Sequence, residues 1–283
     1  MKQIKLLFLL ASASVTGAFA QSNGLTDMSQ SRYAKMANTG IDAVHWTNGF
    51  WGERFNVFSG TSLQSMWNTW NTPEVSHGFR NFEIAAGICK GEHWGPPFHD
   101  GDMYKWMEGV ASVYAVNKDL ELDKLMDNFI ACVVKAQRAD GYIHTPVIIE
   151  ELNKGIDSHT QADSQQQTVI GTKVGSEDEK GAFANRLNFE TYNLGHLMMA
   201  GIVHHRATGK TTLLDAAVKA TDFLCHFYET ASAELARNAI CPSHYMGVVE
   251  MYRATGNPRY LELSKNLIDI RGMVESGTDD NQD

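Results

Sequence analysis

Arg-Ala-Thr-Gly-Lys at residues 206–210 returns as Arg-Ala-Thr-Gly-Asn at residues 253–257, and this repeat is the main evidence for the fold that we expect. The glycine in each copy suits the left-handed backbone conformation that ends a helix. Pro258, directly after the second copy, suits the first turn of a following helix. Each copy therefore predicts two helices joined by a tight turn.

Apolar residues at helical spacing lie on both sides of each copy. Before the first copy they form a stripe of Leu194, Leu197, Met198, Gly201 and Ile202. The two glycines are 47 residues apart, and such a period built from two helices is typical of stacked helical hairpins, in an open solenoid or a closed toroid. The predicted fold is all-α, with hairpins at 103–138, 190–228 and 243–271 and weaker helical stretches near 61–70 and 78–90.

The segment 146–184 differs in character from the hairpins around it, because it is rich in glutamine, charge and glycine. We interpret it as an irregular excursion over one rim of the helical array, not as a linker between domains. Within it, the stretch 147–149 (Val-Ile-Ile) and Val169-Ile170 are candidates for a short β-hairpin. Three or four hairpins are too few to close a toroid, so we expect an incomplete array whose exposed helix faces favour self-association.

The first twenty residues have the layout of a secretory signal peptide. Lys2 and Lys5 are followed by an apolar stretch from residue 6, and Ala18-Phe19-Ala20 forms a small-residue cleavage site. We therefore expect residues 1–20 to be removed and the protein to be exported, to the periplasm or the medium.

The overall charge is acidic. The chain has a formal net charge of −9, and removal of residues 1–20, which carry two lysines, makes it −11. General nucleic-acid binding is excluded because nothing neutralises phosphate. No apolar run reaches the roughly 20 residues that a membrane-spanning helix needs. A neutral ligand such as a sugar stays compatible with this composition.

The four cysteines, Cys89, Cys132, Cys225 and Cys241, are far apart and form no C-x-x-C motif. The sequence therefore predicts no metal site within the chain. Cys132 and Cys225 lie in apolar helical stretches and are expected to be free, buried thiols. A Cys225–Cys241 disulfide is the alternative.

Two polar clusters precede predicted helices. Asp100 and Asp102 lie just before or within the start of one helix, with His99 beside them. The pair could do acid–base chemistry or hold sugar hydroxyls, but a carboxylate that caps the helix is the interpretation we favour. His144 follows an Asp-Gly turn, and we expect it in an extended segment that leaves it exposed at the rim.

His196 follows Tyr192, Asn193 and Gly195 in an unusually polar entry to an apolar helix. Either this histidine is satisfied in the core, or these side chains face a ligand cavity; His244 holds the equivalent place in the next repeat. His204 and His205, at the end of the same helix, are expected to be solvated.

Several motifs occur in one order along the chain, and together they resemble the N-terminal part of glycoside hydrolase family 127, the β-L-arabinofuranosidase family. The motifs are Gly49-Phe50-Trp51-Gly52-Glu53-Arg54, the stretch from Asp100 to Glu108, Ala136-Gln137-Arg138-Ala139-Asp140-Gly141-Tyr142, Tyr192-Asn193-Leu194-Gly195-His196 with Ala207-Thr208-Gly209-Lys210, and Tyr252-Arg253-Ala254-Thr255-Gly256 to Arg271-Gly272. The similarity runs from about Trp46 to the last residue.

The resemblance implies that residues 21–283 form part of an (α/α)6 toroid belonging to a retaining glycosidase for terminal arabinofuranose. In that family a zinc-bound cysteine thiolate is the nucleophile and a glutamate is the acid/base. These residues belong to a later segment, so no cysteine of this chain is assigned; we expect no cofactor within this chain and zinc in a full-length relative. By motif position, His144 and His196 resemble residues that contact the sugar, whereas Asp102 and Glu108 are interpreted as structural.

Two functions follow as hypotheses. The first is an exported β-L-arabinofuranosidase-like hydrolase, truncated before its catalytic Cys/Glu segment. The second is a non-catalytic helical-repeat protein that binds a glycan or a partner. An unsaturated-uronide hydrolase would need a catalytic aspartate pair, and the spacing of Asp100 and Asp102 suits it poorly.

Overall fold

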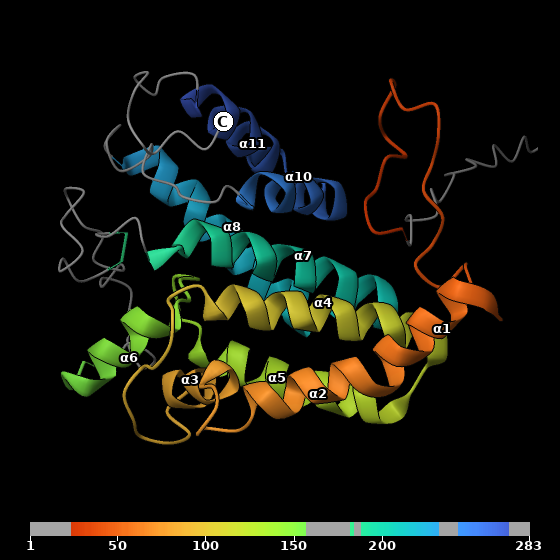
Figure 1. Cartoon of the computed structure of the whole chain (residues 1–283). Helices are drawn as coiled ribbons and strands as arrows, with labels where there is room; N and C mark the ends of the chain where they lie inside the picture. The colour runs from red at the N-terminus through yellow and green to blue at the C-terminus, as the bar shows by residue number, and fades with distance from the viewer. Residues whose placement is uncertain (1–23, 157–181, 184–187, 232–242, 272–283) are drawn as a thin grey trace, which may run out of the picture.

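The computed structural model describes residues 24–156, 182–183, 188–231 and 243–271, and their regular secondary structure is predominantly helical (Figure 1). The all-α prediction is confirmed. None of the described helices is both long and apolar enough to cross a membrane.

Three helical hairpins form the body of the structure, and all three were predicted. They are α4 (His99–Asn117) with α5 (Leu120–Ala136), α7 (Glu190–Thr208) with α8 (Thr212–Thr230), and α10 (His244–Thr255) with α11 (Pro258–Arg271). The weaker stretches form α2 (Leu63–Trp70) and α3 (Gly78–Ala85). In front of α2, α1 (Gly49–Val57) continues through a π-helical turn, Phe58–Ser62.

The turns inside the hairpins have the conformation that the repeat predicts. Gly209 and Gly256 have φ of 79° and 72°, and the N–H of each donates to the carbonyl four residues earlier. Lys118 ends α4 in the same left-handed conformation, with φ of 54°. A lysine thus occupies the position that the other two hairpins give to glycine, at some cost in backbone strain.

The helices lie in two layers. α4, α7 and α10 contact one another in sequence and form one layer, whereas α5, α8 and α11 form the other (Figure 1). Helices α7 and α10 can cross closely because residue 195 is a glycine. A Cβ at this position would lie 2.4 Å from the backbone nitrogen of His244. The glycine before His196 therefore allows α7 and α10 to touch.

The short stretch expected as a β-strand is a helix. α6 (Thr145–Asn153) starts with Pro146 in its first turn, and Val147, Ile148 and Ile149 are buried. The strand prediction is wrong because a three-residue aliphatic run fits either structure, and here its burial against α3 and the proline start favour a helix. Val169 and Ile170 lie outside the described residues.

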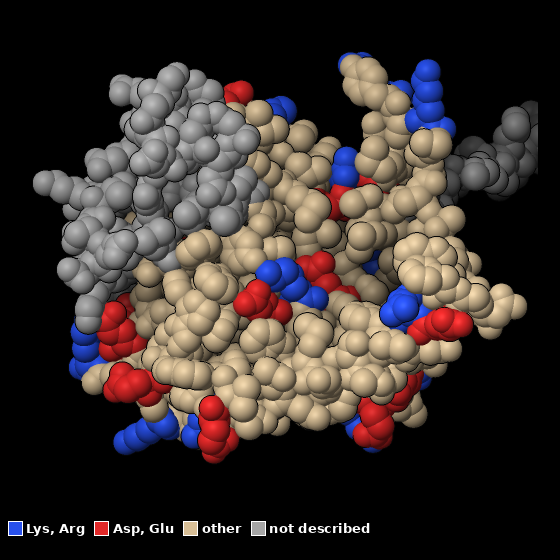
Figure 2. Space-filling model, viewed as in Figure 1, with Lys and Arg blue, Asp and Glu red and all other residues tan. Residues whose placement is uncertain are grey.

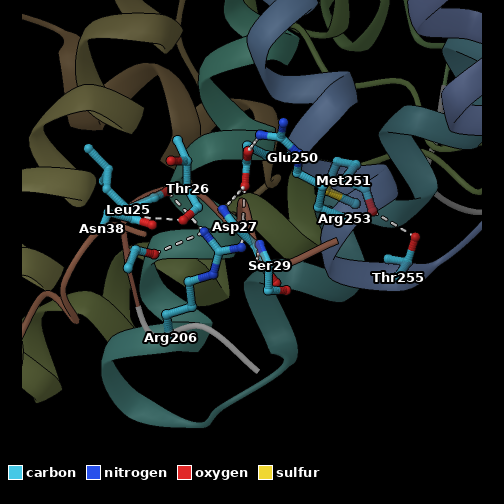
Figure 3. A network of polar contacts seen from close by, with 11 residues as sticks. Leu25, Thr26, Asp27, Ser29, Asn38, Arg206, Glu250, Met251, Arg253 and Thr255 are labelled. Carbon is cyan, nitrogen blue, oxygen red and sulfur yellow. Dashed lines mark hydrogen bonds and ion pairs between the residues drawn. The ribbon is translucent and has the colours of Figure 1, made fainter. Parts of the chain in front are cut away.

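The N-terminal segment is attached to the far end of α7 by a buried polar network (Figure 3). Arg206 donates to the carbonyl oxygens of Gly24 and Leu25 and forms a 3.3 Å ion pair with Glu250. Glu250 also accepts from the backbone N–H of Asp27 and pairs with Arg253. The two arginines of the repeated pentapeptides therefore converge on one carboxylate.

The cysteines of the described region are free. Cys132 and Cys225 are buried, as predicted, and burial raises the pKa of both thiols to about 11. Cys89 is half-buried, and burial raises its pKa as well. Cys241 lies outside the described residues.

Candidate functional site

The starts of α4, α6 and α7 meet, and polar side chains from all three gather there. His144 is the residue immediately before α6, with extended backbone, and it is fully buried. The prediction that it is exposed at the rim is wrong. Its burial follows from Thr145, which donates from its N–H and its hydroxyl to the carboxylate of Asp100, at 2.7 and 2.6 Å. These bonds draw the segment into the core.

Asp100 does not cap α4. The N-cap of that helix is Phe98, whose side chain makes no capping bond, and the Asp100 carboxylate is buried against Thr145. Burial alone would raise the pKa of Asp100, but the neighbouring His144 ring and the two bonds from Thr145 outweigh it, so its pKa lies below the ordinary value. Asp102 pairs instead with Lys105, at 2.8 Å.

Asn193 joins the starts of α4 and α7. Its Oδ1 accepts from the N–H of Gly101 at 2.9 Å, and its Nδ2 donates to the carbonyl of Pro97 at 2.9 Å. The same Nδ2 lies 3.3 Å from Nδ1 of His144. Asn193, at the start of α7, therefore has two roles. It holds the starts of α4 and α7 together, and it contacts the candidate site residue His144.

His196 lies one turn beyond Asn193 on α7. Its side chain is 15% exposed, its Nδ1 is 3.8 Å from Oε1 of Glu108, and its ring meets the Tyr192 ring edge-on. Glu108, which sequence reasoning treated as structural, therefore stands beside a predicted sugar contact. Its Oε1 is buried and accepts no hydrogen bond from the described residues.

His93 also belongs to this neighbourhood. Burial lowers its pKa to about 4, so its ring is neutral at pH 7; Asp100 and His144 are among the groups that act on it electrostatically. The Nε2 atoms of His93 and His144 are both buried and find no partner among the described residues. Unpartnered polar atoms of this kind are expected where a ligand or ordered water binds.

Glu190, the first residue of α7, is a buried carboxylate with a structural role. It accepts from the Tyr142 hydroxyl at 2.6 Å and from the Phe183 N–H at 2.8 and 2.9 Å. Burial raises its pKa. With its oxygens already used, it holds the α7 start against the Asp-Gly turn that carries Tyr142.

The other predicted histidines lie in the core. His244 is fully buried and its ring lies almost parallel to the Tyr228 ring. His204 is fully buried as well, so the expectation that it is solvated is wrong; burial lowers its pKa to about 4. His205 is half-buried, with its ring nitrogen 3.0 Å from the carbonyl of Lys210. His204 is buried because the buried residues of α7 lie on all sides of the helix as far as its last turn. The sequence pattern did not reveal this.

Residues 43–283 match the family model of the β-L-arabinofuranosidase GH127 catalytic domain. This chain belongs to the GH127 family. The family resemblance inferred from the sequence motifs is thereby confirmed.

Curated and solved GH127 relatives are much longer than this chain. A non-reducing end β-L-arabinofuranosidase from Bifidobacterium longum is 31% identical over 198 residues, which are 70% of this chain and 27% of the relative. A solved glycoside hydrolase is 73% identical, with a TM-score of 0.64, over 93% of this chain and 32% of its own. A GH127 β-L-arabinofuranosidase from Geobacillus stearothermophilus T6 is 28% identical, with a TM-score of 0.64, over 83% and 33%. This chain thus spans about a third of the length of these three proteins.

The described part of this GH127 chain does not provide the zinc site that the family resemblance implies. No group of three or more His, Cys, Asp and Glu side chains in the described ranges is arranged to hold a metal ion. The described residues therefore do not fit the metal, and we assign them no step that involves it.

Proposed function

We propose that this chain forms a sugar-binding part of an exported, retaining β-L-arabinofuranosidase. The observation that carries the proposal is that Asn193, one turn before His196 on α7, contacts His144, whose buried Nε2 has no partner among the described residues. Membership of the GH127 family supports the activity, and the signal-like layout of residues 1–20 supports export to the periplasm or the medium.

The proposed role of the two histidines is to bind and orient hydroxyl groups of a terminal arabinofuranosyl unit. Imidazole nitrogens in a buried site can fix a sugar because each pairs with one oxygen. The Tyr192 ring beside His196 offers an apolar face for sugar C–H groups. In the described part of the face in Figure 2, charged side chains lie mostly along the edge, with a small mixed group of acidic and basic side chains near the middle.

Binding without turnover is the second candidate function, and the described cysteines are compatible with it. A nucleophilic cysteine needs a lowered pKa, yet burial raises the pKa of Cys89, Cys132 and Cys225. None of these three thiols is poised as the nucleophile that the family resemblance implies. The zinc and thiolate chemistry of a complete enzyme is therefore proposed to come from residues other than these.

The test is release of arabinose from a chromogenic β-L-arabinofuranoside by the purified chain, with zinc and reductant present, combined with saturation-transfer NMR for L-arabinofuranoside binding. We expect binding that is lost in His196→Ala and retained in His45→Ala, an exposed histidine far along the sequence from the site. Turnover in addition favours the hydrolase, whereas binding alone favours the second candidate. Absence of both from a folded chain contradicts the proposal.

We also propose that the chain self-associates through α1. Phe50 and Trp51 are 60% and 65% exposed there, although both are large apolar side chains. Sedimentation velocity at several concentrations tests this. A Trp51→Glu variant is expected to shift the distribution towards monomer, and a wild-type chain that is monomeric at high concentration contradicts it.

A further inference from the structure

The orientation of the Asn193 amide is determined by two backbone groups. The Gly101 N–H can only donate, and it lies 2.9 Å from Oδ1. The Pro97 carbonyl can only accept, and it lies 2.9 Å from Nδ2. Exchanging the amide oxygen and nitrogen would put donor against donor and acceptor against acceptor. The group that Asn193 turns towards His144 is therefore an N–H donor.

This donor constrains the imidazole. Nδ2 of Asn193 lies 3.3 Å from Nδ1 of His144, and two donors facing each other at this distance repel. Nδ1 of His144 must then be the acceptor, without a proton. In a neutral ring the proton is consequently on Nε2, the atom that is buried and has no partner among the described residues.

Among the described residues, Asp100 is the neighbour that would favour the opposite tautomer, since its carboxylate could accept a hydrogen bond from a protonated Nδ1. Its Oδ2 is 3.6 Å from Nδ1, longer than a hydrogen bond, and both carboxylate oxygens already accept short bonds from Thr145. The lowering of the Asp100 pKa by the His144 ring is the opposing observation, because it needs a proton on the nitrogen that faces Asp100. His93 and Glu190 also act on this region electrostatically, but neither is hydrogen-bonded to Nδ1. Asn193 has the better contact with the ring.

We propose that Asn193 is a positioning residue that holds His144 in the Nε2–H tautomer, so that the ring presents a hydrogen-bond donor to a ligand oxygen. The identity of that ligand rests on the proposed function, but the tautomer does not. A ring held in this way selects an oxygen lone pair and cannot take a proton from a hydroxyl through Nε2. His144 would thus bind and orient a sugar oxygen without acting as a base.

Long-range ¹H–¹⁵N NMR of the full chain with ¹⁵N-labelled histidine tests the tautomer without any ligand. The spectrum separates ring nitrogens that carry a proton from those that do not, and a His144→Gln variant assigns the signals. We expect a protonated Nε2 and an unprotonated Nδ1 at pH 7, in a ratio of at least about ten to one. A protonated Nδ1 in the wild-type chain overturns the proposal.

Two variants identify the residue that sets the tautomer. Asn193→Asp replaces the donor by an acceptor, so we expect Nδ1 of His144 to gain a proton. Asp100→Asn should leave the wild-type pattern unchanged. The reverse result, a change with Asp100→Asn and none with Asn193→Asp, assigns the role to Asp100 and overturns the proposal. Circular dichroism tests whether each variant is folded. If a variant is unfolded, the NMR spectrum of the wild-type chain alone decides which tautomer is present.

The outcome is separable from that of the proposed function. An Nε2–H ring in a chain that neither binds nor hydrolyses arabinofuranosides supports the positioning role and contradicts the function. An Nδ1–H ring in an active chain does the opposite.

Discussion

Arg206 and Glu250 form an ion pair between two hairpins, with side chains that are only 2% and 1% exposed. Removing Arg206 takes one of two cations from the buried Glu250 carboxylate and the donor from the Gly24 and Leu25 carbonyls. Because Arg253 still compensates part of the buried charge, we expect a cost near the lower limit for a broken buried pair, about 3 kcal/mol. We therefore expect Arg206→Met to lower the free energy of unfolding by about this amount in urea denaturation. Arg206→Met combined with Glu250→Met should recover part of the loss, and a double variant less stable than the single one contradicts this account. Lys124→Met, which removes an exposed ion pair, should leave the midpoint unchanged.

The Thr145 hydroxyl should stabilise the site through Asp100. Thr145→Val keeps the shape of the side chain but removes the 2.6 Å bond to the buried carboxylate, at an expected cost of about 1–3 kcal/mol. Thr145→Ser restores the hydroxyl and should recover most of the stability. Equal destabilisation by valine and serine, measured by urea denaturation, would mean that the methyl group matters and the bond does not.

Acid should destabilise the fold through His204. The pKa of His204 is about 4 in the folded chain, whereas its ordinary value, which applies to the unfolded chain, is 6.5. Between pH 4 and 6.5 the unfolded chain therefore binds more protons at this histidine than the folded chain does. The free energy of unfolding then falls as pH decreases from 6.5 towards 4, by up to about 1.4 kcal/mol per pH unit for this group. Urea midpoints measured across this window should decline less steeply in His204→Gln. His45→Gln, at an exposed position, should retain the wild-type slope. An unaltered slope in His204→Gln excludes this histidine as a cause.

Gly195 should tolerate no side chain. A Cβ there would lie 2.4 Å from the nitrogen and 2.6 Å from the Cα of His244, and backbone cannot move aside without separating α7 from α10. We expect Gly195→Ala to destabilise the chain by about 1–3 kcal/mol or more. Gly60→Ala is the matched control, because a Cβ on Gly60 meets nothing within 4 Å. Thermal unfolding of the two variants should differ clearly; similar midpoints would show that the helices can part at little cost.

The hairpins could be predicted because their signals are local. Helical spacing and the glycines at 209 and 256 fix two of the three turns, and Lys118 could be placed in the third only by analogy with them. The stretch 147–149 could not be assigned, since three aliphatic residues carry no period and their packing against α3 decides the structure.

The sequence could nominate candidate site residues but not their geometry. His144 and His196 were nominated through motif position, and their contact with a sugar stays a prediction. The burial of His144 depends on Asp100, 45 residues before Thr145, and on bonds from Thr145 that no spacing reveals. The proximity of Glu108 to His196 could not be predicted for a related reason. Glu108 lies on α4 while its neighbour His196 lies on α7, and only the packing of those helices puts the two side chains together.

The attachment of the N-terminal segment has a consequence for the order of events during synthesis. The carbonyl of Gly24 is bound by a residue 182 positions later, and the N–H of Asp27 by one 223 positions later. The part of the chain that is made first must therefore wait until translation has passed Arg206 for its first bonds and Glu250 for its last. A ribosome-bound chain arrested before Arg206 should leave residues 24–27 open to protease, and one arrested well beyond Glu250 should protect them.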